Sequence, residues 1–174
     1  MNCVGNESNT EPTFEICNNC SPCKSINKGN FLDVIEVDAA SRTGVDGIRE
    51  IIDAVMYSPN NARFKVYIID EVHMLSNAAF NALLKTLEEP PENVKFIFAT
   101  TEIKKIPATI ISRCQRFDLQ RVDIYTLRTH LSKICESENI KFENDSLFQI
   151  CKASEGSVRD ALSLLDQAAS LCQD

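Results

Sequence analysis

The stretch VYIIDEVHMLS, residues 66–76, decides the fold that we expect of this chain. Its first four residues are apolar or aromatic, and they lead directly into two carboxylates, Asp70 and Glu71. A continuous apolar run that ends in charge predicts a strand buried on both faces of a parallel sheet. Ligands of open α/β sheets bind beyond the carboxyl ends of the strands, so both carboxylates would stand where a ligand binds.

The acidic pair suits a magnesium ion that is bound to phosphate. Mg²⁺ prefers one or two carboxylates, with waters and substrate phosphates completing its shell. In this interpretation Asp70 holds the metal and its waters, and Glu71 orients or deprotonates an attacking water, as in the Walker B motif of a nucleoside triphosphatase. The residues alone leave a second interpretation open, in which the pair is a solvated strand end or a helix cap.

Composition limits the class of protein. The chain has 174 residues, of which 44% are hydrophobic, and a formal net charge of −7. This length suffices for one domain, or for one core with a small helical appendage. Because no stretch approaches the ~20 apolar residues that span a membrane and no signal peptide is visible, we expect a cytoplasmic protein with no membrane partner. The acidic charge argues against strong nucleic-acid binding by the chain alone.

Four of the eight cysteines cluster near the amino terminus. Cys3, Cys17, Cys20 and Cys23 have the spacing Cys-x13-Cys-x2-Cys-x2-Cys, which predicts a closed shell of four thiolates around a structural Zn²⁺. A disordered segment and an iron–sulfur cluster are the alternatives, although the Cys-Pro continuation of a ferredoxin run is missing. The remaining cysteines are expected to be small buried apolar residues: Cys114, Cys135, Cys151 and Cys172.

Further strands and helices surround the acidic pair. We expect strands at residues 31–38, 64–70, 95–99 and 115–119, and helices at 45–57, 77–89 and 108–112. The first two strands and the helix between them form a βαβ unit, whose strands should be parallel. The helix that starts after Ser76 ends before Pro90, and His73 is assigned to the turn that follows the acidic pair.

Three polar positions near these elements have two interpretations each. Glu88 lies in the last turn of its helix, the unfavourable end for the macrodipole, and is either solvated or in contact with a basic partner surface. Thr100 and Thr101 follow the third strand at the same edge as Asp70. A threonine there either hydrogen-bonds a γ-phosphate or the attacking water, or caps the next turn.

From Asp123 the sequence predicts only helices. Their apolar stripes indicate a small three-helix bundle, and consist of Leu127, Leu131 and Ile134, then Leu147, Ile150 and Cys151, then Val158, Ala161, Leu162, Leu165 and Ala169. Gly156 ends the second helix and Ser157 caps the third. Arg159 lies in the first turn of the third helix, where a cation is unfavourable, and this hints at an anionic ligand.

Four long segments resemble the gamma/tau subunits of bacterial DNA polymerase III, the AAA+ motor of the clamp loader. They are DVIEVDAASRTGVDGIREI (33–51), FKVYIIDEVHMLSNAAFNALLKTLEEPPENVKFIFATTE (64–102), KIPATIISRCQRF (105–117) and GSVRDALSLLDQA (156–168). The resemblance implies an incomplete α/β core of the AAA+ P-loop type, built on a parallel sheet, at residues 29–121. It also implies an N-terminal four-cysteine zinc module at 1–28 and a C-terminal helical lid at 122–174.

The resemblance assigns roles to matched positions. Asp70 and Glu71 correspond to the Walker B pair, Thr101 to sensor 1, and Arg159, in the lid, to sensor 2. Arg113 corresponds to the arginine finger that reaches the ATP of a neighbouring subunit. The implied cofactors are a structural Zn²⁺ together with Mg²⁺ and ATP. The implied function is loading of the sliding clamp onto primed DNA during replication, with the other clamp-loader subunits of a hetero-pentameric ring as partners.

The chain departs from the family pattern in two places. The interval between Cys3 and Cys17 is longer than in the family, and the phosphate-binding loop Gly-x4-Gly-Lys-Thr is missing from a chain with only five glycines. We therefore expect an N-terminally truncated fragment that does not bind Mg²⁺–ATP by itself. A non-hydrolysing scaffold that binds partner subunits is the alternative. A helicase with a DExH box at residues 70–73 is a weaker rival, because the sequence lacks Gln-x2-Gly-Arg-x2-Arg.

Overall fold

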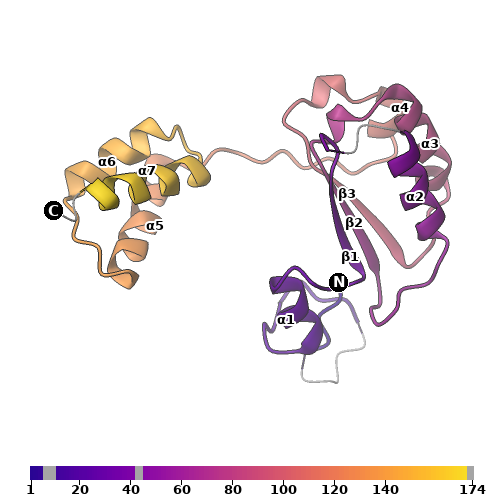
Figure 1. Ribbon diagram of the computed structural model, residues 1–174, viewed down its shortest axis with the longest axis horizontal. Coiled ribbons are helices and arrows are strands. Elements are labelled where there is room, and N and C mark those ends of the chain that lie inside the picture. Colours follow the sequence, from indigo (N-terminus) through magenta and orange to yellow (C-terminus); the bar gives the residue numbers. More distant parts are fainter. Residues whose placement is uncertain (6–10, 42–44, 172–174) are drawn as a thin grey trace. The chain divides into compact units, whose positions relative to one another are not determined.

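The computed structural model describes residues 1–5, 11–41 and 45–171. The chain divides into two compact units, Met1–Arg116 and Phe117–Asp174, which are described separately (Figure 1). Cys172 and residues 42–44 of the loop after the first predicted strand lie outside the described residues. Within the described ranges, no helix is both long enough and apolar enough to cross a membrane.

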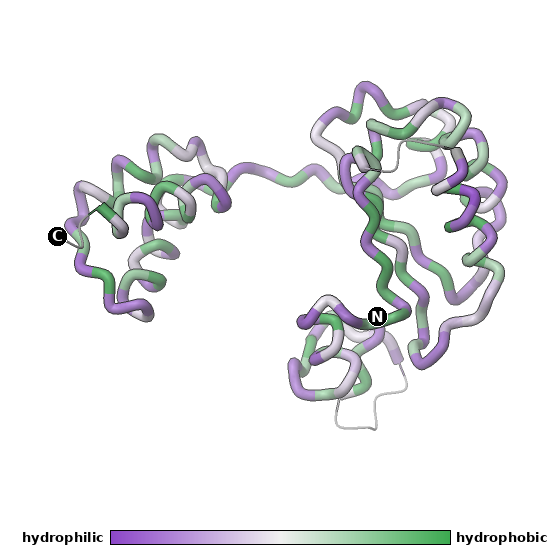
Figure 2. Tube along the Cα trace, in the orientation of Figure 1, coloured by the Kyte–Doolittle hydropathy of each residue, from purple (hydrophilic) through white to green (hydrophobic). Residues whose placement is uncertain are grey.

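The first unit is built on a parallel sheet. Its strands are β1 (Val34–Asp38), β2 (Lys65–Asp70) and β3 (Val94–Phe98), hydrogen-bonded in the order β1-β2-β3. Figure 2 shows hydrophobic residues along these strands, as expected where a sheet contributes to a core. The register pairs Asp38 with Asp70, so that neighbouring strands end together. Three predicted strands and their parallel arrangement are therefore confirmed.

Helices α2 (Val45–Val55), α3 (Asn77–Glu88) and α4 (Ala108–Ile111) lie on one side of this sheet (Figure 1). The core between them contains fully buried side chains from both layers, among them Ile48, Tyr67, Ile69 and Leu83. Helix α3 starts where predicted, because the Ser76 hydroxyl accepts a 3.2 Å hydrogen bond from a backbone N–H in the first turn.

A buried lysine joins the sheet to the end of α2. Lys65, the first residue of β2, is only 8% exposed, and its Nζ donates a 2.8 Å hydrogen bond to the carbonyl oxygen of Ala54. The last carbonyls of a helix lack intrahelical partners and carry the negative end of the macrodipole. Because α2 has no basic residue in its own last turn, Lys65 supplies this cation from the neighbouring strand.

Short helices complete the first unit: α1 (Ser21–Asn27), η1 (Val72–Met74) and η2 (Ile103–Lys105).

The strand predicted at residues 115–119 is not formed, and this prediction is wrong. Phe117 and Leu119 are 74% and 95% exposed, and no strand pairs with this segment. Its alternating apolar residues match a strand pattern, but an isolated strand has no ladder to satisfy its backbone.

The second unit is the predicted helical bundle, with α5 (Ile124–Ser137), α6 (Asn144–Ala153) and α7 (Val158–Leu171). Its buried core comprises Leu127, Leu131, Cys135, Leu147, Cys151, Ala161 and Leu165. One stripe residue departs from the prediction, because Leu162 is 37% exposed. Ser157 caps α7 by accepting a hydrogen bond from the N–H of Asp160 at 3.3 Å.

Candidate functional site

The carboxyl ends of the three strands are joined by backbone hydrogen bonds. The N–H of Ala39 donates to the Asp70 carbonyl at 2.9 Å, and the N–H of Ala99 donates to the Ile69 carbonyl at 2.9 Å. Just beyond the strands, the N–H of Val72 donates to the Ala99 carbonyl at 3.0 Å. These bonds hold the residues that follow β1, β2 and β3 at one edge of the sheet, where a ligand of a parallel sheet is expected.

The acidic pair turns the chain sharply out of β2. Glu71 has left-handed backbone angles, φ 47° and ψ 43°, which are uncommon for a residue with a Cβ. Its N–H donates a 2.9 Å hydrogen bond to Asp70 Oδ1. Strained backbone of this kind concentrates at functional sites, where it fixes the direction of a side chain.

The pair meets the predicted threonine at the end of β3. Thr101 Oγ1 donates to Glu71 Oε2 at 3.2 Å, which brings together two residues that are 30 positions apart. Thr100 performs the capping that was the alternative for these threonines, since its Oγ1 accepts from the N–H of Glu102 at 3.0 Å. The two neighbouring hydroxyls therefore have different hydrogen-bond partners.

Asp38, at the end of β1, hydrogen-bonds to residues of the loop that follows it. Its carboxylate accepts from the N–H of Ala40 at 2.7 Å and from the hydroxyl of Ser41 at 2.8 Å. These hydrogen bonds, led by that of Ser41, lower the pKa of Asp38. Among the carboxylates at this edge, Asp70 and Glu71 are consequently the better candidates for a metal and an attacking water.

Arg113 makes its contacts at a different place in the first unit. Its guanidinium pairs with the Glu88 carboxylate and donates a 2.7 Å hydrogen bond to the Thr109 carbonyl. Glu88, expected to be solvated or to face a basic partner surface, therefore has a basic neighbour within its own unit. Nothing in the spacing of 25 residues indicated this ion pair.

Arg159 belongs to the second unit, in the first turn of α7. Its side chain is exposed, and within the residues that the structure describes its guanidinium makes no hydrogen bond or ion pair. Its own backbone carbonyl accepts a 3.1 Å hydrogen bond from Ser163, one turn further along the helix. The cation therefore remains available to an anionic ligand.

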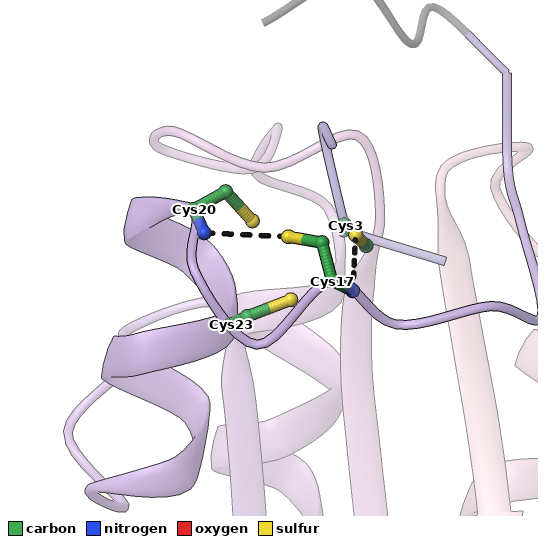
Figure 3. Close-up of side chains that lie close together, drawn as sticks. All are labelled: Cys3, Cys17, Cys20 and Cys23. Atoms are coloured by element: carbon green, nitrogen blue, oxygen red, sulfur yellow. Dashed lines mark hydrogen bonds between the residues drawn. The ribbon is translucent and has the colours of Figure 1, made fainter. Parts of the chain in front are cut away.

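The four N-terminal cysteines form one cluster. The Sγ atoms of Cys3, Cys17, Cys20 and Cys23 all lie within 4.8 Å of one another and point toward a common centre (Figure 3). Zn–S bonds of about 2.3 Å in a tetrahedron place sulfurs about 3.8 Å apart, so a small contraction completes such a shell. The donor set fits a closed structural zinc site.

Backbone N–H groups point at these sulfurs, as thiolates require. The N–H of Cys17 donates to Cys3 Sγ at 3.5 Å, and the N–H of Cys20 donates to Cys17 Sγ at 3.3 Å (Figure 3). Such hydrogen bonds lower the pKa of Cys3, and the N–H of Cys23 is the main cause of a Cys20 pKa of about 6. Burial raises the pKa of Cys23 to about 12, so this thiol depends most on a metal for its ionisation.

The N-terminal segment that carries the four cysteines, called the cysteine module, contacts the amino end of β2. Asn2, which is 5% exposed, accepts from the N–H of Phe64 at 2.9 Å and donates to its carbonyl at 2.8 Å, and Arg63 donates to the carbonyl of Cys3. The acidic pair lies at the opposite end of the same strand. The cysteine cluster and the acidic pair therefore belong to opposite ends of the strand.

Comparison with known families identifies both units. A family model described as "DNA polymerase III, delta subunit" matches residues 2–123. A second model, "DNA polymerase III clamp loader subunit, ATPase lid domain", matches residues 126–174.

Curated relatives carry related names. The chain is 53% identical over 171 residues to "DNA polymerase III subunit tau/gamma" of Haemophilus influenzae, covering 98% of this chain and 24% of that protein. It is 57% identical over 163 residues to "DNA polymerase III subunit tau" of Bacillus subtilis, covering 94% and 29% respectively. The chain thus spans about a quarter of the length of these two relatives.

Solved structures share the fold. A gamma subunit-related protein of DNA polymerase III from Thermotoga maritima matches with a TM-score of 0.52 and 26% identity, over 72% of this chain and 43% of that one. The Holliday junction branch migration motor RuvB of the same organism matches with a TM-score of 0.62 and 18% identity, over 75% and 43%. The second likeness concerns the fold alone.

Proposed function

The chain belongs to the family of DNA polymerase III clamp-loader subunits, and on this premise we propose that it is the section of a tau- or gamma-type subunit that carries the hydrolytic side of an ATPase site. The assembled motor would use ATP to load a sliding clamp onto primed DNA during replication. Its partners would be the other clamp-loader subunits, the clamp and the primed DNA. The net charge of −7 suits contact with DNA through the assembly rather than through this chain alone.

One observation carries this proposal. Asp70 and Glu71 end β2 at the edge of the sheet, and Thr101, at the end of the adjacent β3, donates to Glu71 Oε2 at 3.2 Å. A metal-binding carboxylate, a carboxylate for water and a polar hydroxyl thus converge where parallel sheets bind ligands. When bound, Mg²⁺ neutralises charge on the phosphate oxygens.

Each residue of this edge has a chemical task. Asp70 is exposed, and its carboxylate would hold the metal. Glu71 accepts a proton from, or orients, the attacking water, and Thr101 keeps that carboxylate against the end of β3. The two carboxylates have different partners, because Asp70 Oδ1 accepts from the N–H of Glu71 and Glu71 Oε2 accepts from the Thr101 hydroxyl.

Two arginines are proposed to act on phosphate from other positions. Arg113 would reach the nucleotide of a neighbouring subunit, leaving its ion pair with Glu88. Arg159 would approach from the helical lid. A guanidinium suits both tasks because it is always charged and offers several N–H donors to phosphate oxygens.

A structural Zn²⁺ held by Cys3, Cys17, Cys20 and Cys23 completes the proposal. The cluster geometry and its N–H donors support four thiolate ligands with no open coordination position. The segment around these cysteines has few buried apolar residues, so metal binding would supply much of its order.

The sequence given has no Gly-x4-Gly-Lys-Thr loop, so we propose that this chain alone does not hold nucleotide. The test is calorimetric titration of Mg²⁺–ATP into the chain, alone and joined to a segment that carries such a loop. We expect no saturable heat at sub-millimolar ATP for the chain alone, and binding and turnover for the joined form. In the joined form Glu71→Gln should retain binding and lose turnover, whereas equal turnover by this variant would overturn the proposed site.

A non-hydrolysing scaffold is the second candidate, and the missing phosphate loop favours it. Such a protein would bind partner subunits through its folded units without using the sheet edge. Titration and ATPase assays of the joined form discriminate the two. A joined form that binds partner subunits but shows no turnover, with or without Glu71→Gln, would support the scaffold.

A further inference from the structure

A nearly buried histidine stands beside the acidic pair. Only 7% of the His73 side chain is exposed, although it lies in the short helix η1 at the edge of the sheet. Its Nδ1 lies 2.9 Å from Thr100 Oγ1 and 3.2 Å from Glu71 Oε2. Its Nε2 lies 3.6 Å from Glu102 Oε1. The ring therefore touches groups at the ends of two strands.

Glu71 is the nearer of the two carboxylates beside the ring, and it favours a proton on Nδ1 over one on Nε2. A carboxylate accepts hydrogen bonds and does not donate them, so an unprotonated Nδ1 at 3.2 Å from Glu71 Oε2 would place two lone pairs against each other. A proton on Nδ1 lies between the Thr100 hydroxyl oxygen at 2.9 Å, its hydrogen-bond partner, and the Glu71 carboxylate at 3.2 Å, toward which it brings a positive end. Thr100 is already fixed as a neighbour, because its Oγ1 accepts from the N–H of Glu102.

We propose that His73 is a positioning residue for Glu71, holding the carboxylate that acts on the attacking water through Nδ1–H. This inference rests on the proposed function of Glu71. Oε2 then has two neighbours, the Thr101 hydroxyl, which donates a hydrogen bond at 3.2 Å, and the His73 ring, whose Nδ1 lies 3.2 Å away. Within the described residues Oε1 has no hydrogen-bond partner, so this oxygen is the one left for water.

The anchor matters because a glutamate side chain has several rotatable bonds. Glu71 is 37% exposed at its side chain, and the strained backbone directs only its Cβ. The His73 ring and the Thr101 hydroxyl together restrict the remaining side-chain torsions of Glu71 before a substrate binds. A displacement of about 1 Å in a catalytic group can cost roughly 10²-fold in rate, which is the scale of the effect expected here.

Substitutions at His73 separate the two ring nitrogens. The amide of His73→Asn can place its nitrogen near the position of Nδ1, whereas that of His73→Gln reaches toward the position of Nε2. His130, an exposed residue of α5 and the only other histidine in the sequence, provides the matched control His130→Asn. A positioning role through Nδ1 predicts that Asn preserves function and Gln does not.

The first test is spectroscopic and uses the full chain without nucleotide. Long-range ¹H–¹⁵N correlation should show the His73 ring protonated at Nδ1, and His130→Asn assigns the signals because one histidine remains. The β-proton couplings of Glu71 should report one rotamer in the parent chain and in His73→Asn, and averaged rotamers in His73→Gln. A bare Nδ1, or a Glu71 rotamer that all variants share, would overturn the proposal.

The second test measures turnover in the form joined to a phosphate loop. His73→Gln should lower kcat by roughly 10- to 100-fold with KM nearly unchanged, and His73→Asn should recover most of it. His130→Asn should match the parent. A parallel rise in KM, or equal losses for Asn and Gln, would refute positioning. If Glu71→Gln leaves turnover intact, the proposed function fails while the spectroscopic result still reports the ring's proton.

Discussion

Replacing Asp33 by asparagine should destabilise the first unit. Asp33 is 1% exposed, and its two carboxylate oxygens accept from the N–H groups of Asn60 and Asn61 at 2.8 and 2.9 Å. Asp33 directly precedes β1, and these two hydrogen bonds attach the loop between α2 and β2 to it. An asparagine has the same shape but only one oxygen, so its NH₂ group would face one of the two N–H donors.

Two effects of opposite sign decide the magnitude. A hydrogen bond to a charged group contributes about 1.5–3 kcal/mol, and the variant loses one and gains a donor–donor contact. Removing a buried charge recovers part of its desolvation penalty, which a neutral amide does not carry. Because both oxygens are engaged at short distances, the hydrogen bonds should win, with a net loss of about 2 kcal/mol out of a typical 5–15 kcal/mol.

Amide hydrogen exchange is the suitable assay, because it reports the two units separately. A loss of about 2 kcal/mol should raise exchange of the β2 core amides by roughly 30-fold. The matched control Glu36→Gln, at an exposed carboxylate on β1, should change exchange little. Burial and then the charge of Asp33 raise the pKa of Tyr67, so the variant should also ionise this phenol at lower pH. Unchanged or slower exchange in Asp33→Asn would refute the reasoning, since desolvation would then dominate.

Three further predictions concern other parts of the chain. Gly156→Ala should destabilise the second unit by about 1–3 kcal/mol in urea unfolding, because the φ of Gly156 is +80° and an added Cβ would lie 2.6 Å from the Val122 carbonyl oxygen. An unchanged free energy of unfolding would contradict this geometry. Metal analysis should give about one zinc per chain, and much less for Cys20→Ser with Cys23→Ser; iron bands or no metal in the parent would refute the site. In a ring assembled from the form joined to a phosphate loop, Arg113→Ala should cut turnover by roughly 10³-fold or more while its own subunit still binds ATP, and Glu88→Gln should leave turnover unchanged. Lost binding in the same subunit would indicate a structural role.

The sequence predicts those parts of the fold that local chemistry dictates. Apolar runs that end in carboxylates mark β1 and β2, and the Ser76 hydroxyl marks the start of α3 because capping involves residues three positions apart. The strand expected at residues 115–119 shows the limit of this reasoning. Its pattern is that of a strand, but pairing depends on a neighbour that the pattern does not contain.

The contacts that build the site join residues far apart in sequence. Thr101 and Glu71 could be placed at one sheet edge, because parallel strands end together. The side chains that hold them were not predictable in the same way. His73 meets Thr100 across 27 residues and Glu88 meets Arg113 across 25, and each pair depends on how a turn or helix end is rotated. Only rotamers and packing, not spacing, determine such contacts.

The two proposed sites of the first unit lie at opposite ends of β2. Its amino end receives the cysteine module through the Asn2–Phe64 pair, and its carboxyl end presents Asp70 and Glu71. A buried strand is rigid, so the module can stabilise the edge where chemistry is proposed without touching it. The proposed zinc would order the segment that docks before β2. Hydrogen bonds among the residues that follow β2 and β3 hold the acidic turn at the other end of the same strand.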